Sequence, residues 1–161
     1  KQTGVDMLIW DSACVVHEEF RLHDLDALQS AYPDAGLLVH PESPEEMIDR
    51  ADAVGSTTQL IDAAARLQNP SFIVATDKGI FYKMQQQVPE KLLIAAPTRG
   101  AGGTCQSCAH CPWMAMNRLS GIDRLLDAWP DSCEVLVDEK LAAQAMKPLT
   151  RMLKFKAPYA E

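Results

Sequence analysis

Short apolar runs alternate with amphipathic helical patterns along most of the chain, which is typical of stacked β-α units around a mainly parallel sheet. The strand-like runs end at turn residues, and the helical stretches repeat apolar residues three or four positions apart. Strands are predicted at 7–10, 36–40, 53–55, 71–76, 91–96 and 134–137. Helices are predicted at 44–51, 57–67, 79–87, 113–129 and 139–155. The predicted fold class is therefore α/β, with repeated β-α units in three-layer α/β/α domains.

Two local patterns add detail to this prediction. Val16, Phe20, Leu25 and Leu28 have the spacing of one helical stripe that ends before Tyr32-Pro33. The helix at 44–51 is predicted to begin with Ser43 as its N-cap and with Pro44 at its first helical position, where each residue type is favoured.

A change of composition divides the chain. The segment 98–104 holds three glycines in seven residues and is predicted to be a loop. We therefore expect an α/β domain over residues 1–97. A second region over residues 98–161 would begin with this loop and continue as an α/β segment.

Length, composition and charge exclude several classes of protein. The 161 residues correspond to about one domain, and 47% hydrophobic against 23% charged residues is typical of a globular chain. The net charge of −7 argues against a large basic surface for nucleic acid or anionic lipid. The apolar runs fall far short of the roughly 18 residues of a membrane span. With five cysteines, an odd number that favours a reducing compartment, we expect a cytoplasmic protein that binds neither nucleic acid nor membrane.

The strongest chemical signal is Cys105-Gln-Ser-Cys108-Ala-His-Cys111-Pro112. Two residues between thiols let a tight turn aim several sulfurs at one metal, although position 115, where ferredoxins place a fourth cysteine, is alanine. Four interpretations are open on these residues alone. They are an iron-sulfur site, a zinc site completed by His110, a redox-active Cys105/Cys108 pair, and buried inert thiols.

Further candidates follow three predicted strands. Cys14 and His17 share one face at a predicted helix start, or are simply buried. His40 and Glu42 are candidates for proton transfer and for binding an amine or hydroxyl, or belong to an ordinary loop. In Gly55-Ser-Thr57, the hydroxyls and the helix N-terminus form a cradle for a carboxylate or phosphate, unless Ser56 and Thr57 are only helix caps. Because parallel strands end at one edge of a sheet, we expect these groups to meet there.

Several unusual motifs occur together in a fixed order. They are His40-Pro-Glu42, Gly55-Ser-Thr57, Ala75-Thr-Asp-Lys-Gly-Ile-Phe-Tyr-Lys-Met84, Cys105-x-x-Cys108 and Cys111-Pro-Trp-Met-Ala-Met-Asn117. Together they make the chain resemble the quinolinate synthase family, the A proteins of NAD biosynthesis. The resemblance covers Lys1 to about Phe155 and corresponds to about the C-terminal half of such an enzyme, in keeping with a sequence that begins without an initiator Met.

The resemblance implies a cofactor and its ligands. Members of the family have three related α/β domains around a pseudo-threefold axis, with a [4Fe-4S] cluster in the central cavity that three cysteines hold. By motif, Cys14 and Cys111 match the second and third ligands, and the first would lie upstream of Lys1. Cys105 and Cys108 then look like a neighbouring thiol pair, which we expect to be a redox-sensitive disulfide.

The resemblance also implies an activity. Quinolinate synthases condense iminoaspartate with dihydroxyacetone phosphate to quinolinate, with loss of phosphate and water, and L-aspartate oxidase would supply the iminoaspartate. By motif, His40 and Glu42 match substrate-binding and proton-transfer residues. Pro41, Ser56, Thr57 and His17 are the other candidates for substrate binding. Because the family's N-terminal catalytic residues have no counterpart here, we expect this chain alone to be inactive.

A non-catalytic function remains as the alternative. In that interpretation Cys105, Cys108 and Cys111 form a local metal-binding or redox module, and His40-Pro-Glu42 is structural. The two functions differ in their dependence on Cys14, which only the enzyme requires.

Overall fold

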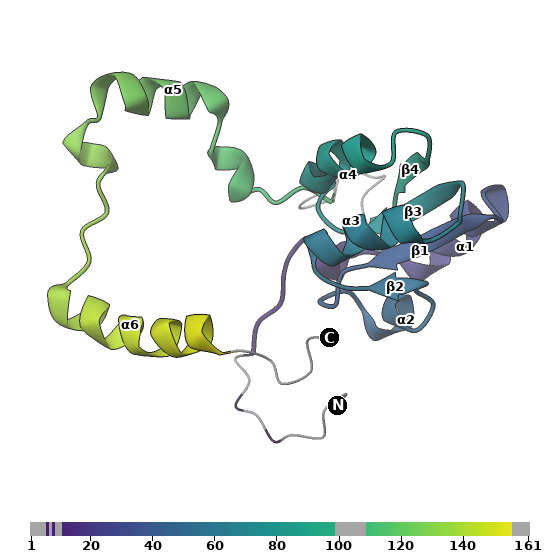
Figure 1. Cartoon of the computed structure of the whole chain (residues 1–161), viewed down its shortest axis with the longest axis horizontal. Coiled ribbons are helices and arrows are strands. Elements are labelled where there is room, and N and C mark those ends of the chain that lie inside the picture. The colour runs from purple at the N-terminus through teal and green to yellow at the C-terminus, as the bar shows by residue number, and fades with distance from the viewer. Residues whose placement is uncertain (1–5, 7, 9–10, 99–108, 156–161) are drawn as a thin grey trace. The chain divides into compact units, whose positions relative to one another are not determined.

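The structure is a computed structural model that describes residues 6, 8, 11–98 and 109–155. The chain forms two compact units, Lys1–Met116 and Asn117–Glu161, whose elements are labelled in Figure 1. Unit 1 contains η1 (His17–Glu19), α1 (Leu22–Ala31), β1 (Ala35–Val39), α2 (Glu45–Ile48), β2 (Ala53–Val54), α3 (Thr57–Arg66), β3 (Ser71–Ala75), η2 (Lys78–Ile80), α4 (Phe81–Gln87), β4 (Leu92–Ala95) and η3 (Met114–Met116). Unit 2 contains α5 (Leu119–Ala128), η4 (Asp131–Cys133) and α6 (Glu139–Lys154).

The four strands of unit 1 form one sheet in the order β2-β1-β3-β4, and every pair is parallel. The two central strands, β1 and β3, are buried along almost their whole length. Parallel strands need crossover connections, and the helices between the strands provide them. The predicted α/β fold with a mainly parallel sheet is therefore confirmed.

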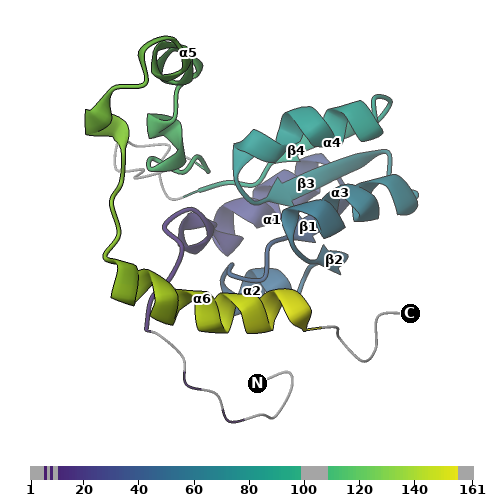
Figure 2. The same ribbon diagram turned by 60° about the vertical axis from the view of Figure 1, so that its left-hand side comes forward.

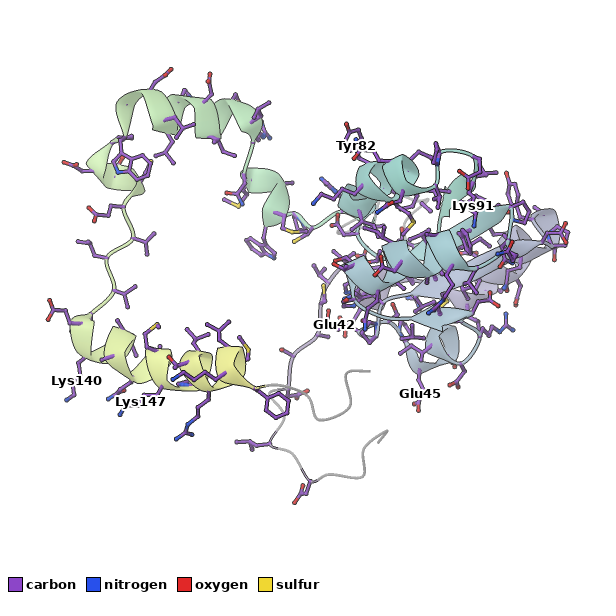
Figure 3. All side chains as sticks on the ribbon, viewed as in Figure 1. Glu42, Glu45, Tyr82, Lys91, Lys140 and Lys147 are labelled. Atoms are coloured by element: carbon purple, nitrogen blue, oxygen red, sulfur yellow. The ribbon has the colours of Figure 1, made fainter. Side chains whose placement is uncertain are left out.

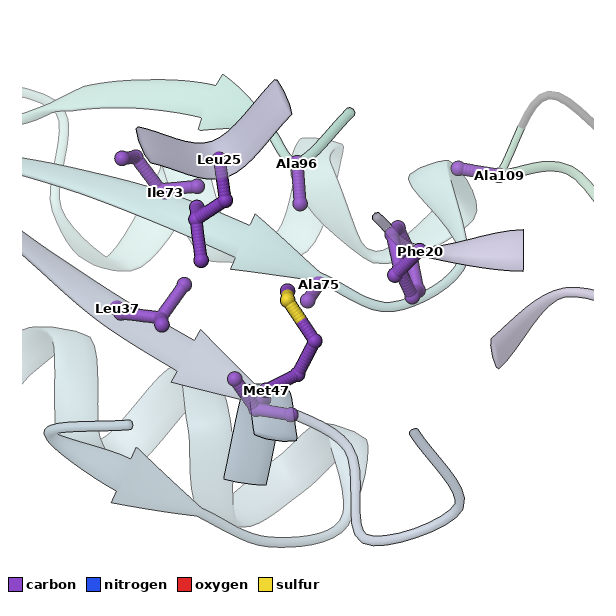
Figure 4. Packing of buried hydrophobic residues seen from close by; sticks show 9 residues of the cluster. Phe20, Leu25, Leu37, Met47, Ile73, Ala75, Ala96 and Ala109 are labelled. Atoms are coloured by element: carbon purple, nitrogen blue, oxygen red, sulfur yellow. The ribbon is translucent and has the colours of Figure 1, made fainter. Parts of the chain in front are cut away.

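Helices cover both faces of this sheet, as Figure 2 shows. Successive residues of β3 face opposite sides, so Ile73 and Ala75 pack with residues of α1 and α2. Phe72 and Val74 pack with α3 and α4 on the other side. Figure 4 shows the first of these cores, in which Met47 of α2 lies against the sheet. The result is a three-layer α/β/α arrangement.

Most of the predicted elements of unit 1 are present with shifts of one or two residues at their ends. The strands predicted at 36–40, 53–55, 71–76 and 91–96 correspond to β1, β2, β3 and β4. The helices predicted at 57–67 and 79–87 correspond to α3 and to η2 followed by α4. The strand predicted at 7–10 lies outside the described residues.

The helical stripe predicted from Val16 to Leu28 is confirmed only in its second half, where α1 carries Leu25 and Leu28 and ends before Tyr32. Its first half is wrong, because the chain is extended at Phe20. Phe20 has φ −64° and ψ 139° and forms an antiparallel bridge with Thr98. The Arg21 N–H donates to the Pro97 carbonyl at 3.2 Å. Pairing with a segment far along the chain, together with burial of the Phe20 ring, overrides the local helical spacing.

The start predicted for the helix at 44–51 is also wrong. The helix α2 spans only Glu45–Ile48, and Pro44, with ψ 142°, is its N-cap. Ser43 instead belongs to a turn in which its N–H donates to the His40 carbonyl at 3.0 Å. Ser43 Oγ is buried and has no hydrogen-bond partner within the described part of the chain. The turn after β1 therefore takes the residue that would have capped the helix.

The chain from residue 113 onward departs from the prediction in two places. The helix predicted at 113–129 is interrupted, because Arg118 is extended (ψ 146°) between η3 and α5. The strand predicted at 134–137 is absent, and its three apolar residues are exposed. The helix predicted at 139–155 is confirmed as α6, with Pro148 inside it. Among the described residues, no helix is long and apolar enough to cross a membrane.

Candidate functional site

Three strands of the sheet end side by side at its carboxyl edge, and predicted site residues follow two of them, β1 and β2. Val39, the last residue of β1, is in register with Val54 of β2 and Ala75 of β3. The residues that follow these strands, His40, Gly55 and Thr76, are therefore neighbours at one edge. The His40 N–H donates to the Ala75 carbonyl at 3.1 Å, and the Gly55 N–H donates to the Val39 carbonyl at 3.2 Å.

His17 lies at the centre of this edge and is 7% exposed. Its Nδ1 is 3.1 Å from Glu42 Oε2, and its Nε2 is 3.1 Å from Thr76 Oγ1. The ring stacks on that of His40, with centroids 4.0 Å apart and an interplanar angle of 5°. The short helix η1 holds the backbone here, since the His17 N–H donates to the Cys14 carbonyl at 3.1 Å. Both ring nitrogens therefore have partners from different strand ends.

The environment of His17 favours its neutral form. Burial lowers the pKa of His17 below 6.5, and the neighbouring His40 lowers it further, whereas Glu42 and Asp77 oppose the shift. A neutral imidazole has one donor and one acceptor nitrogen. The carboxylate of Glu42 can only accept, so Nδ1–H donates to it, and Nε2 accepts from the Thr76 hydroxyl. This tautomer satisfies both contacts.

The Glu42 carboxylate lies close to both histidines, and its side chain is exposed at the surface. Its Oε2 lies 3.5 Å from His40 Nδ1 as well as 3.1 Å from His17 Nδ1. The Glu42 side chain is 58% exposed while that of His17 is 9% exposed, and Figure 3 shows Glu42 at the border of unit 1. A carboxylate that is fixed on one side and open on the other is suited to bind, and to accept a proton from, a small polar molecule.

Cys14 lies beside these groups. Its Sγ, a ring nitrogen of His17 and a carboxylate oxygen of Glu42 all lie within 4.8 Å of one another. Cys14 and Cys111 are both half-buried free thiols. Thiolates are the ligands of iron-sulfur clusters, and a free, partly accessible thiol is what such a ligand requires. The chemistry of both cysteines therefore fits the cluster that the sequence motifs imply.

Cys111 is attached to the same edge through Asp77, two residues after β3. Asp77 Oδ2 accepts the Cys111 N–H at 2.7 Å, and Oδ1 accepts the Gly79 N–H at 2.7 Å. The next residue, Lys78, donates its N–H to the Ala109 carbonyl at 2.8 Å. These bonds tie the segment that carries Cys111 to the end of a central strand.

The remaining candidates are placed less closely. Ser56 is the N-cap of α3, and Gln59 Oε1 accepts its N–H at 2.8 Å as half of a capping box. Ser56, Thr57 and Pro41 are exposed beside the strand ends, and no contact joins them to His17. Cys105 and Cys108 lie outside the described residues.

Sequence reasoning missed two residues of this edge, Thr76 and Asp77. Both follow the buried strand β3 directly. The rule that selected His40 and Ser56, namely a polar residue just after a buried parallel strand, also identifies them. Both residues also belong to the motif from Ala75 to Met84.

The chain also matches a known protein family over most of its length. The family model described as Quinolinate synthetase A protein matches residues 1–154 of the 161-residue chain. The match includes both strand-end motifs, Cys14 and Cys111, and all described elements of the two units. This chain belongs to the Quinolinate synthetase A protein family.

Proposed function

We propose that this chain forms part of a cytoplasmic quinolinate synthase that condenses iminoaspartate with dihydroxyacetone phosphate. The observation that carries the proposal is the network at the carboxyl edge of the sheet, in which Glu42 bridges His17 and His40 beside the free thiol of Cys14. Family membership supports the quinolinate synthase role. L-Aspartate oxidase is the proposed source of the iminoaspartate.

Cys14 and Cys111 would hold two corners of a [4Fe-4S] cluster, and a cysteine outside these 161 residues would hold the third. When bound by three thiolates, such a cluster supplies one iron with an open position, which acts as a Lewis acid toward a substrate oxygen. Because the site needs groups from outside this chain, we propose that the chain alone is inactive.

The chain's own side chains would bind substrate and move protons. Glu42 accepts a proton, or a hydrogen bond from an imine or hydroxyl, on its exposed side. His17 is buried and neutral, so its role is to hold the Glu42 carboxylate through Nδ1–H. His40 lies against the same carboxylate and is the second proton-transfer group. Ser56 and Thr57, at the N-terminus of α3, donate to a substrate carboxylate or phosphate.

Metal content after anaerobic reconstitution tests the proposal. A version extended upstream should hold about four irons with matching acid-labile sulfide, and Cys14→Ser or Cys111→Ser should reduce this content at least severalfold. Cys133→Ser is the matched control, because Cys133 is a free, exposed thiol in unit 2. Iron loss in Cys105→Ser with retention in Cys14→Ser would contradict the proposal and favour the local metal or redox module.

A further inference from the structure

We propose that Asp77 is the positioning residue for Cys111, so that it fixes the place of this thiol before any metal binds. The role of Cys111 as a cluster ligand rests on the proposed function. The positioning itself rests on hydrogen bonds within this chain and is measurable without a cluster.

The first argument is that both oxygens of one buried carboxylate are used by the backbone. Asp77 is 8% exposed, and its two oxygens accept the N–H groups of Cys111 and Gly79, each at 2.7 Å. Hydrogen bonds to a charged acceptor are stronger than neutral ones, and burial strengthens them further. A side chain with two such bonds has a fixed orientation, and it fixes the backbone of Cys111 in turn.

The second argument is the backbone before Cys111. Ala109 is buried and has φ +58°, a left-handed conformation that residues other than glycine adopt uncommonly. A conformation of this kind persists only when its surroundings hold it. The bond from Lys78 N–H to the Ala109 carbonyl and the bond from Cys111 N–H to Asp77 enclose this position on both sides. The turn after β3 is therefore what holds the cysteine segment in its strained form.

The third argument is the place of Asp77 in the sheet. β3 is a central strand that is buried along its length. Thr76, which precedes Asp77, donates to His17 Nε2. His17 comes three residues after Cys14. Two successive residues at the end of one rigid strand thus contact the segments of both cysteines that the family motif assigns to the cluster. Asp77 therefore caps η2 and, in addition, holds the backbone of Cys111.

Asp77→Asn separates positioning from bulk, because the side chain keeps its size. An amide has one acceptor oxygen, and its NH₂ group would face a backbone N–H, so one of the two bonds is lost. The bond that remains is weakened too, because its acceptor is no longer charged. Asp52→Asn is the matched control. Asp52 Oδ2 also accepts one backbone N–H, that of Leu37, at 2.7 Å, and within the described part of the chain it has no hydrogen bond or ion pair with the residues around Cys111.

Amide hydrogen exchange of the metal-free chain, together with alkylation of each cysteine by iodoacetamide, tests the positioning. In Asp77→Asn we expect exchange at Cys111 and its alkylation to accelerate about tenfold, the factor for one lost hydrogen bond to a charged group. Alkylation of Cys14 should stay unchanged, and Asp52→Asn should leave Cys111 as in the wild type. Unchanged exchange at Cys111 would overturn the inference, as would an equal acceleration at Leu37, which would indicate general destabilisation.

A second measurement connects the inference to the cluster. In the version extended upstream, Asp77→Asn should lower the iron retained after a chelator challenge severalfold, and Asp52→Asn should not. If the wild-type protein holds no iron at all, the proposed function fails while the exchange result still decides the role of Asp77. If iron binds and Asp77→Asn retains all of it, the thiol does not need Asp77 and the inference is overturned.

Discussion

At the scale of single residues, the site depends on one buried imidazole whose nitrogens are both used. Glu42 accepts a hydrogen bond from His17 Nδ1–H, and the Thr76 hydroxyl donates one to His17 Nε2. A buried polar group without a partner is costly, so the two partners are as necessary as the ring itself. The exposed carboxylate of Glu42 is the part of this network that is free to meet a ligand.

Glu42→Gln tests that carboxylate. The amide keeps the size of the side chain but cannot accept a proton, so we expect kcat of the complete enzyme to fall by about 10²–10⁴. Cluster content should remain close to that of the wild type. Glu46→Gln is the control, because Glu46 is an exposed carboxylate in the first turn of α2. An unchanged kcat in Glu42→Gln would remove Glu42 from proton transfer.

The lowered pKa of His17 predicts a pH dependence of stability. In the unfolded chain His17 takes up a proton as the pH falls below 6.5, whereas folded His17 stays neutral until a lower pH. Because the unfolded state then binds more protons, the free energy of unfolding decreases as the pH falls from 6.5 toward the folded pKa, and is fully restored above 6.5.

Urea denaturation of the metal-free chain between about pH 7.5 and 5.5 measures this effect. His17→Gln should have a smaller loss of stability over this range than the wild type. His23→Gln, which changes an exposed histidine, should follow the wild-type curve. A His17→Gln curve parallel to that of the wild type would show that the folded pKa is not lowered.

At the scale of elements, close packing of the central strands fixes where small residues are required. A Cβ on Gly36 of β1 would lie 2.7 Å from Phe72 Cε1 and 3.1 Å from Asn69 Cγ. Such a distance forces the neighbours apart. The glycine therefore lets the Phe72 ring lie directly over the backbone of the adjacent strand.

Gly36→Ala should consequently lower the free energy of unfolding by about 1–3 kcal/mol. Urea denaturation followed by circular dichroism measures it. Gly121→Ala is the matched control, since nothing lies within 4 Å of a Cβ at Gly121 in α5, and alanine favours a helix by about 1 kcal/mol. Equal stability of Gly36→Ala and the wild type would mean that Phe72 moves aside without cost.

The same scale shows what the sequence could predict. β1 and β3 were predictable because a short, continuous apolar run bounded by turn residues is a local signal. Phe20 was not, because its extended backbone depends on pairing with Thr98, which is remote in sequence. The meeting of His40 and Ser56 at one edge followed from parallel strands alone. The contact of Asp77 with Cys111 depends on the path of a loop, for which the sequence carries no periodic signal.

At the scale of the whole chain, the two units differ in how far their side chains are buried. Unit 1 contains both cores. Within the described residues of unit 2 no side chain is buried, and Val135 and Leu136 are 85% and 83% exposed. The segment 134–138 has no helix or strand. The stability of the described chain is therefore concentrated in unit 1.

Limited digestion with thermolysin, which cleaves before apolar residues, tests this difference. Early cleavage is expected at Val135–Val137, because an exposed and irregular segment enters a protease site readily. The span from Ala35 to Ala96, which holds the sheet, should survive about tenfold longer. Mass spectrometry identifies the fragments. Early cuts inside β1 or β3 would contradict the assignment of stability to unit 1.

Because Thr76 and Asp77 follow β3 directly, the length of β3 determines which of the two side chains reaches which partner. The hydroxyl meets the imidazole of His17, and the carboxylate meets the backbone of Cys111. An insertion or deletion of one residue within β3 would also turn its apolar side chains to the wrong faces of the sheet. An insertion would bring the Thr76 hydroxyl to the place where the Asp77 carboxylate now meets Cys111, and a deletion would bring the Asp77 carboxylate to the place where the Thr76 hydroxyl now meets His17. Insertions and deletions among related chains are therefore expected in the connection between α3 and β3, at 67–70, and not in β3 itself.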